Sequence, residues 1–368
     1  MTQKIKDPTD LIRDEILQLK AYTVVDARGL IKLDAMENPY AWPKSLYAEW
    51  TDALTRSAVN RYPDPHPANL LNHLRDAFQI PAASGILLGN GSDELLQILI
   101  TAIARPGATV LSVAPTFVMY DLLTRVAGLE YLSVPLTATF DLNEAELLQT
   151  IRKKQPELIF LAYPNNPTGN RFDDRVVEAV LNTASGLVIL DEAYAAFTDH
   201  SYLERLSQFK NLLVLRTLSK MGMAGLRLGY LIGSPVWIEQ LDKIRLPYNI
   251  NVLTQVTVEL ALRHKAVFDE QVRLIRAERA RLFQALQAVN GVQVFPSEAN
   301  FLLLRTPKGL ALPWHQGLRE RGILIKNLHG SAPSLEDCLR VTVGTLAEND
   351  RFLSALTTIS ASIVPDAV

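Results

Sequence analysis

The sequence predicts an α/β protein with two domains: a large one built on a mostly parallel sheet of the seven-stranded type between helices, and a smaller α+β domain. Three observations support this prediction. Short apolar runs alternate with helical segments through the middle of the chain, which is typical of a sheet covered by helices. The runs LIFLA, LVIL and LLVL are apolar throughout, as in strands buried on both faces. With 368 residues, the chain is long enough for two domains.

The segments before this repeat show few regular elements. Residues 1–20 predict a short amphipathic helix, because several apolar residues fall roughly on one face: Leu11, Ile12, Ile16, Leu17 and Leu19. The stretch LDAMENPYAWP (33–43) predicts a loop, since its prolines break helices. The prolines of RYPDPHPANL (61–70) predict an extended or turned segment, because proline biases the residue before it away from the helical region.

The repeat itself predicts strands that end in polar turns. GILLGNGSDELLQILITAIA is typical of a strand, a glycine turn and a helix, with Ser92 as the helix N-cap. ATVLSVAPTFVMYDLLTRVAG predicts a second strand and helix. ELIFLAYPNNPTGNRF, GLVILDEAYAAF and NLLVLRTLSK each predict a strand with polar residues at its end, and LRLGYLIG predicts a further strand.

The last third of the chain has a different pattern. Residues 252–289 predict one long helical stretch with room for a kink, and the segments GVQVFPSEANFLLLR and CLRVTVG predict strands. We therefore expect an N-terminal arm (1–40) that packs with the small domain, a large domain (41–260) and a small C-terminal α+β domain (261–368).

Composition narrows the class of protein. The 37 basic and 39 acidic residues give a net charge of −2, which argues against a dedicated nucleic-acid binder and gives no reason to expect an anionic membrane surface as partner. Cys338 is the single cysteine, so no intramolecular disulfide and no cysteine-based zinc site can form. No signal-peptide core and no apolar run of membrane-spanning length is present. We expect a cytoplasmic protein.

Polar residues that could form a site follow the predicted strands, and ligands of open α/β sheets bind at the carboxyl ends of strands. In GNGSDE (89–94), glycines allow a tight turn before a helix, whose free N–H groups suit a phosphate; a plain strand-to-helix turn is the simpler reading. The motif is neither a dinucleotide fingerprint nor a Walker A loop.

Three further stretches end at the same edge. YPNNPTG (163–169) offers two side-chain amides, although a proline turn alone explains it. Asp191 ends the buried run LVILD, where a carboxylate needs a partner: a cation, a metal or a protonated heterocycle. No histidine is nearby, which makes a metal the weaker choice. Lys220 ends another buried run, and a lysine there can lose its proton and attack carbonyls; Arg227 supplies a fixed charge.

A phosphate cradle, an aspartate, a lysine and an arginine at one sheet edge suit a single ligand. Pyridoxal phosphate has a phosphate, a basic ring nitrogen and an aldehyde that reacts with lysine.

On these motifs the chain resembles the fold-type I pyridoxal-phosphate enzymes, and among them the class I/II aminotransferases. The order of GSDE, NNPTG, DEAY, TLSK and a late arginine carries this resemblance from residue 89 to 340. Within that superfamily the chain is similar to the histidinol-phosphate aminotransferase family, through LDAMENPY (33–40), NRYPDP (60–65), LRTLSKMGMAGLRLGY (215–230) and CLRVTVGT (338–345).

The resemblance implies a role for each matching residue. Lys220 would bind the cofactor covalently and later carry the proton, and Asp191 would keep the pyridine nitrogen protonated. Tyr194 and Asn166 would bind the ring hydroxyl, and Phe117 would stack on the ring. The residues implied at the cofactor phosphate are Gly91, Ser92, Asp93, Ser219 and Arg227, joined by Tyr62 from across a dimer interface.

At the substrate the resemblance implies Tyr40, Asn166, Lys326 and Arg340. Arg340 would hold the substrate phosphate. Lys326 stands where related enzymes often have a second arginine, and a lysine neutralises phosphate without the arginine fork.

The implied protein is a homodimeric enzyme of histidine biosynthesis. It would transaminate histidinol phosphate with 2-oxoglutarate, giving imidazole-acetol phosphate and glutamate. Three alternatives remain open: an aromatic or broad-specificity aminotransferase, a threonine-phosphate decarboxylase, and a non-catalytic pyridoxal-phosphate-binding regulator. The last is disfavoured because every catalytic side chain is present and no DNA-binding module is attached.

Overall fold

The centre of the molecule is a seven-stranded sheet with the strand order β2-β8-β7-β6-β5-β3-β4. The computed structural model describes residues 6–21 and 23–362. Strand β8 runs antiparallel to both of its neighbours, and the other pairs are parallel. The predicted mostly parallel sheet is therefore confirmed. Its strands are β2 (Gly85–Asn90), β3 (Thr109–Ala114), β4 (Glu130–Pro135), β5 (Leu158–Ala162), β6 (Leu187–Asp191), β7 (Leu212–Thr217) and β8 (Leu228–Gly233).

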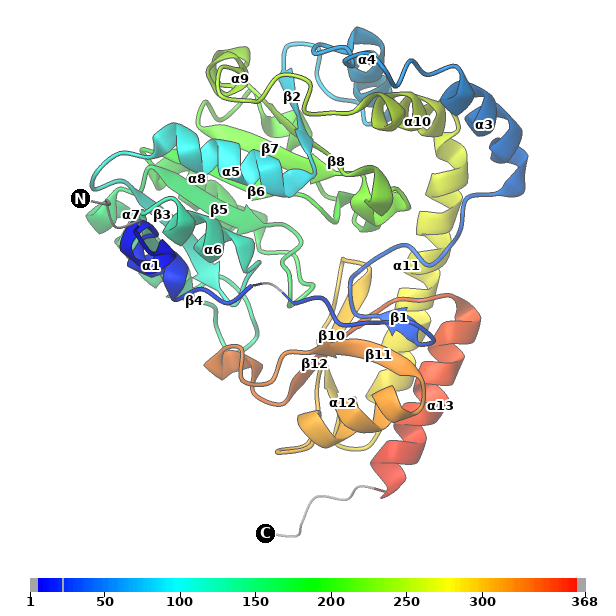
Figure 1. Ribbon diagram of the computed structural model, residues 1–368. Coiled ribbons are helices and arrows are strands. Elements are labelled where there is room, and N and C mark those ends of the chain that lie inside the picture. The colour runs from blue at the N-terminus through cyan, green and yellow to red at the C-terminus, as the bar shows by residue number, and fades with distance from the viewer. Residues whose placement is uncertain (1–5, 22, 363–368) are drawn as a thin grey trace, which may run out of the picture.

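Helices cover both faces of this sheet (Figure 1). Alternate residues of one strand enter different cores: Ile159 and Leu161 of β5 pack in one cluster, whereas Leu158 and Phe160 pack in the other. This explains why the strands are apolar without alternation. One face is covered by α4 (Ala68–Ala77), α7 (Glu144–Lys154) and α8 (Asp174–Thr183), and the other by α5 (Ser92–Ile103), α6 (Met119–Val126) and α9 (Pro235–Asp242).

A second, smaller sheet has the order β1-β11-β12-β10-β9. Strand β1 pairs in parallel with β11, and the remaining pairs are antiparallel. Helices α12 (Ala311–Glu320) and α13 (Leu346–Ser362) pack on it around Trp314. Its strands are β1 (Ile31–Leu33), β9 (Gln293–Val294), β10 (Phe301–Arg305), β11 (Ile323–Asn327) and β12 (Cys338–Thr342).

The two sheets are joined by helices at one side of the molecule (Figure 1). The predicted long helical stretch is divided into α10 (Val252–Arg263) and α11 (Lys265–Gln287), because His264 leaves the helical conformation with φ −105° and ψ 28°. Helix α10 packs on α3 (Tyr47–Thr55) and α4, while α11 touches β10 and α13 of the smaller sheet.

The N-terminal arm differs from the predicted single helix. Two short helices form, α1 (Pro8–Leu11) and α2 (Asp14–Leu17), because Ile12 and Arg13 between them are extended. Arg13 donates a hydrogen bond to the carbonyl of Val126, and α2 lies against α6 of the large sheet. Further along the arm, β1 joins the small sheet. The first five residues of the expected helix lie outside the described residues, and the domain boundaries stay a prediction.

We predict that Gly186→Ala destabilises the protein. A Cβ atom at Gly186 would lie 2.1 Å from the carbonyl oxygen of Pro156, a backbone atom that cannot move aside locally. The free energy of unfolding should fall by about 1–3 kcal/mol, as for other overpacked sites. Gly225→Ala is the matched control, because nothing lies within 4 Å of its Cβ position. Urea denaturation checks both, and equal midpoints would contradict the prediction.

Candidate functional site

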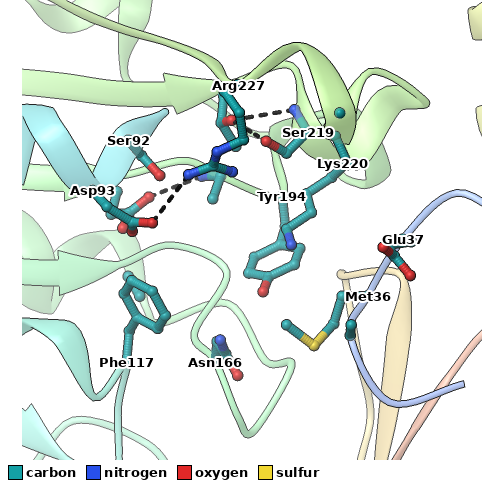
Figure 2. A pocket seen from close by; sticks show the side chains of 17 residues that line it. Met36, Glu37, Ser92, Asp93, Phe117, Asn166, Tyr194, Ser219, Lys220 and Arg227 are labelled. Carbon is teal, nitrogen blue, oxygen red and sulfur yellow. Dashed lines mark hydrogen bonds and ion pairs between the residues drawn. The ribbon is translucent and has the colours of Figure 1, made fainter. Parts of the chain in front are cut away.

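A cavity of about 370 Å³ opens where the parallel strands end. Its walls come from the segments after β2, β3, β5, β6 and β7 and from residues 35–37, which follow β1 of the small sheet. Figure 2 shows the side chains converging on it. The residues expected from the sequence that line it are Ser92, Asp93, Phe117, Asn166, Asp191, Tyr194, Ser219, Lys220 and Arg227.

Asp191 is the last residue of β6 and is 4% exposed. Its Oδ2 accepts a hydrogen bond of 2.7 Å from the hydroxyl of Tyr120, and its Oδ1 accepts one of 3.1 Å from the Ala193 amide. Burial raises the pKa of Asp191 to about 6, and the two hydrogen bonds oppose that shift because they favour the charged form. The carboxylate is thus oriented, and a cationic group in the cavity would stabilise its charge.

Lys220 lies in the short 3₁₀ helix Ser219–Met221, directly after β7. Burial first, and then the positive charge of Arg340, lower the pKa of Lys220 to about 8. The Nζ atom lies 5.8 Å from the centroid of the Tyr194 ring. A lysine with a lowered pKa has a substantial fraction of free amine near neutral pH, which makes it a nucleophile toward carbonyl groups.

The cavity wall beside the N-terminus of α5 carries a guanidinium group. Arg227 pairs with Asp93 through Nη2 and Oδ2 at 3.3 Å, as Figure 2 shows. A Cβ atom at Gly91 would lie 2.4 Å from that Nη2, so a larger residue would displace the guanidinium from this position. Gly91 also has φ +82° and occupies the N-cap of α5. The sequence-based assignment of Ser92 as the cap was wrong: the chain turns at Gly91, and Ser92 is the first helical residue.

Asn166 lines the cavity, and Arg340 of the small sheet contacts Asn166 without lining the cavity itself. Arg340 is buried, donates a hydrogen bond from Nη1 to Oδ1 of Asn166, and donates another of 3.0 Å from Nη2 to the carbonyl of Asp34. Its guanidinium also lies over the ring of Phe301, 5.2 Å from the centroid. One arginine therefore joins strand β12, the arm and the turn after β5.

Other expected site residues lie outside the cavity wall. Lys326 is half-buried and is the cross-strand partner of Arg340 in the register of β11 and β12. Tyr40 is half-buried and packs on the cluster that contains Tyr194. Tyr62 is 80% exposed and stacks on Tyr248, so it does not reach the cavity of its own chain.

Sequence reasoning missed Tyr120, Met36 and Glu37. Tyr120 is fully buried, donates to Asp191 and stacks on Phe160 with centroids 4.7 Å apart. The only available signal was its place three residues after Phe117. Met36 and Glu37 stand in a proline-rich loop, and nothing local in the sequence shows that this loop crosses to the end of the large sheet.

We predict that Lys220 reacts with acylating reagents at unusually low pH. In protein free of bound ligand, its labelling should reach half its maximum near pH 8, because burial and Arg340 disfavour the charged amine. Arg340→Gln removes a positive charge and should move the midpoint upward, by about one unit at most. Competitive labelling read by mass spectrometry checks this. A midpoint near the ordinary lysine value of about 10.4 would contradict it.

Among the described residues, no cluster of histidine, cysteine and acidic side chains has a geometry suited to a metal ion. Within the same part of the chain, no helix combines the length and apolar character needed to cross a bilayer.

Comparison with known proteins shows which family the chain belongs to. The family model of aminotransferase class I and II matches residues 28–356. Histidinol-phosphate aminotransferase 2 of Nitrosococcus oceani is 51% identical over 345 residues, covering 94% of this chain and 96% of the relative. The corresponding enzyme of Chromobacterium violaceum is 50% identical over 346 residues, covering 94% and 97%.

A solved structure shares the fold. Histidinol-phosphate aminotransferase from Sinorhizobium meliloti, crystallised with pyridoxal 5'-phosphate, superposes with a TM-score of 0.85 at 23% identity, covering 96% of this chain and 98% of that one. The match to the family model and the match to the relatives both span most of the chain, and the range of the family model includes every residue that lines the cavity. The chain belongs to the class I and II aminotransferases.

Proposed function

We propose that the cavity binds pyridoxal 5'-phosphate and that the protein transaminates L-histidinol phosphate with 2-oxoglutarate, giving imidazole-acetol phosphate and L-glutamate. The observation that carries the proposal is that Lys220 and Asp191, a lysine of lowered pKa and a buried carboxylate, line one cavity. When bound, the cofactor supplies an aldehyde that reacts with amines and a ring that withdraws electrons from the substrate carbon.

The residues present fit this cofactor. Arg227, Ser92 and Ser219 line the cavity beside the N-terminus of α5, which suits a phosphate. Asp191 would hold a proton on the ring nitrogen, Tyr194 and Asn166 would bind the ring hydroxyl, and Phe117 would cover the ring face. Lys220 would bind the aldehyde and, once free, would move the proton at the substrate carbon.

The substrate end supports a phosphorylated amino donor. Arg340 is buried beside Asn166, and Lys326 is its cross-strand neighbour, so two cations flank this end. Arginine grips phosphate or carboxylate with two parallel hydrogen bonds, which would let one site accept histidinol phosphate and then 2-oxoglutarate. The names of the relatives agree with this substrate.

We also propose that two copies associate through the segments around Tyr62 and Tyr248. Four large apolar side chains are exposed there, and the two tyrosine rings stack with centroids 4.5 Å apart. Exposed apolar surface of this kind marks an interface. In a dimer, Tyr62 would reach the phosphate end of the partner's cavity. The exposed residues are Val59, Tyr62, Leu246 and Tyr248. We also propose that the protein is cytoplasmic.

The proposed reaction is tested by a panel of half-reactions. Purified protein carrying its cofactor is mixed separately with histidinol phosphate, phenylalanine, tyrosine and glutamate, and the absorbance change is followed. We expect histidinol phosphate to give the highest kcat/KM among the first three. A kcat/KM for phenylalanine that equals or exceeds it would overturn the assignment in favour of an aromatic aminotransferase. Release of carbon dioxide from threonine phosphate would indicate a decarboxylase.

We predict that Lys220→Ala abolishes turnover and the borohydride-reducible adduct between protein and cofactor. The variant removes the only amine among the residues that line the cavity, and a substitution that removes a covalent catalyst lowers the rate by several orders of magnitude. Absorbance and mass spectrometry after reduction check the adduct. Retained activity would defeat the assignment of Lys220.

We predict that Tyr120→Phe lowers kcat by roughly tenfold or more. The change removes the hydroxyl that donates to Asp191 and leaves the ring stacking intact, and a hydrogen bond to a charged group is worth about 1.5–3 kcal/mol. Without that donor, the pKa of Asp191 rises further. Tyr131→Phe is the control, because Tyr131 bonds Ser112 instead. Cofactor affinity and its absorbance spectrum should change in the first variant only.

A further inference from the structure

A short segment of the arm reaches the cavity at the side away from the phosphate end. We call residues 34–38 the strap. Figure 2 shows its Met36 and Glu37 across the cavity from Asp93 and Phe117. Both residues line the cavity. The functions assigned above to cofactor binding use neither of them, so the strap is available to contact the substrate.

The strap is held firmly by the small sheet. The amide of Met36 donates to Oγ1 of Thr342 at 3.0 Å, and its carbonyl accepts from Nδ2 of Asn300 at 2.9 Å. The carbonyl of Asp34 accepts from Arg340. Met36 has φ +52°, a left-handed conformation that a methionine seldom adopts and that its two backbone hydrogen bonds maintain. The hydrogen bonds of Met36 therefore also fix the position of the next residue, Glu37.

The other side of Glu37 is anchored as well. Nδ2 of Asn38 donates to Oε1 of Gln271 on α11 at 2.9 Å, and the same Nδ2 lies against Gly222, two residues after Lys220. Anchors on both sides fix the backbone of Glu37. A side chain on a fixed backbone can discriminate between substrates, because the distance to a bound ring is set in advance.

The carboxylate of Glu37 is half-exposed and pairs with Nζ of Lys32. A carboxylate repels a phosphate group, so a phosphorylated donor would direct its phosphate to the guanidinium of Arg340 and away from Glu37. Arg340 contacts the strap at the Asp34 carbonyl, so the ring of the same donor would lie within reach of Glu37.

The chemistry of the two candidate rings differs at this position. An imidazole has an N–H donor in its neutral form and two in its charged form, and it titrates near pH 6.5. Either form can donate to a carboxylate. A phenyl ring has no hydrogen-bond donor. It would displace water from the carboxylate without replacing the hydrogen bonds that the water made. A site built around a hydrogen bond rejects an analogue that lacks the donor.

We propose that Glu37 determines donor specificity by accepting a hydrogen bond from the imidazole ring of the amino donor, with the Met36 side chain beside it against the ring. The inference rests on the proposed function, because it assumes that the donor carries an imidazole. It adds the group that selects this ring over a phenyl ring.

The test uses two donors that differ only in the ring, L-histidinol phosphate and L-phenylalaninol phosphate. Their kcat/KM values are measured with the wild-type enzyme, Glu37→Met and Glu37→Gln. We expect Glu37→Met to lower the preference for the imidazole donor by roughly tenfold or more, with turnover of the phenyl donor kept or raised. Glu37→Gln keeps a hydrogen-bond acceptor but loses the charge, so its preference for the imidazole donor should lie between those of the wild-type enzyme and Glu37→Met. Turnover of the phenyl donor also shows that the variant is folded.

Glu49→Gln is the matched control, because Glu49 is equally exposed and ion-paired, with Arg263, but does not line the cavity. It should leave the preference unchanged. An equal fall for both donors in Glu37→Met, or an unchanged preference, would overturn the role of Glu37 and leave the proposed function standing. A wild-type enzyme that prefers the phenyl donor would overturn the proposed function, and the role of Glu37 with it.

Discussion

The burial of a lysine and a carboxylate in the same cavity is the constraint on which the site depends. Water stabilises both charges, and removing it shifts both pKa values toward neutrality. The pKa of Asp191 is raised to about 6, and that of Lys220 is lowered to about 8. Each group is therefore poised to exchange a proton near physiological pH. The cavity can contain both because the parallel strands β6 and β7 are neighbours and end at the same edge.

A buried ion pair next to the cavity stabilises the positions of Asp191 and Lys220. Glu192 follows Asp191 and is buried on the far side of the strand end, where it pairs with Arg216 at 2.7 Å. The Tyr202 amide and the Ser201 hydroxyl also donate to that carboxylate. The pair ties the end of β6 to the end of β7. Glu192 is one residue from Asp191, and Arg216 is four residues from Lys220. With the Tyr120 hydrogen bond on the other side, it fixes where Asp191 and Lys220 can lie.

The small sheet contributes to the site through a few long-range contacts. Arg340 reaches from β12 to Asn166, and Thr342 and Asn300 hold the strap. The end of the cavity that we assign to the substrate is thus shared between the two sheets, whereas the end that we assign to the cofactor is lined by residues of the large sheet. This division suits an enzyme that keeps one cofactor and exchanges two different substrates, because the parts that contact substrate can vary without disturbing the cofactor pocket.

The sequence by itself determined the local features. Apolar runs fixed the strands of the large sheet, and the polar residues at their ends identified Asp191, Lys220, Arg227 and the Gly91 turn, because each of these depends on neighbours within a few residues. The pairing of residues far apart was decided only by the tertiary structure. Met36 and Thr342 are 306 positions apart, and Tyr120 and Asp191 are 71 apart. No periodicity or turn chemistry records such contacts, since they follow from the order of the strands and the path of the arm. The arm also broke into two short helices where Arg13 found a partner at Val126, a contact that the sequence pattern does not contain.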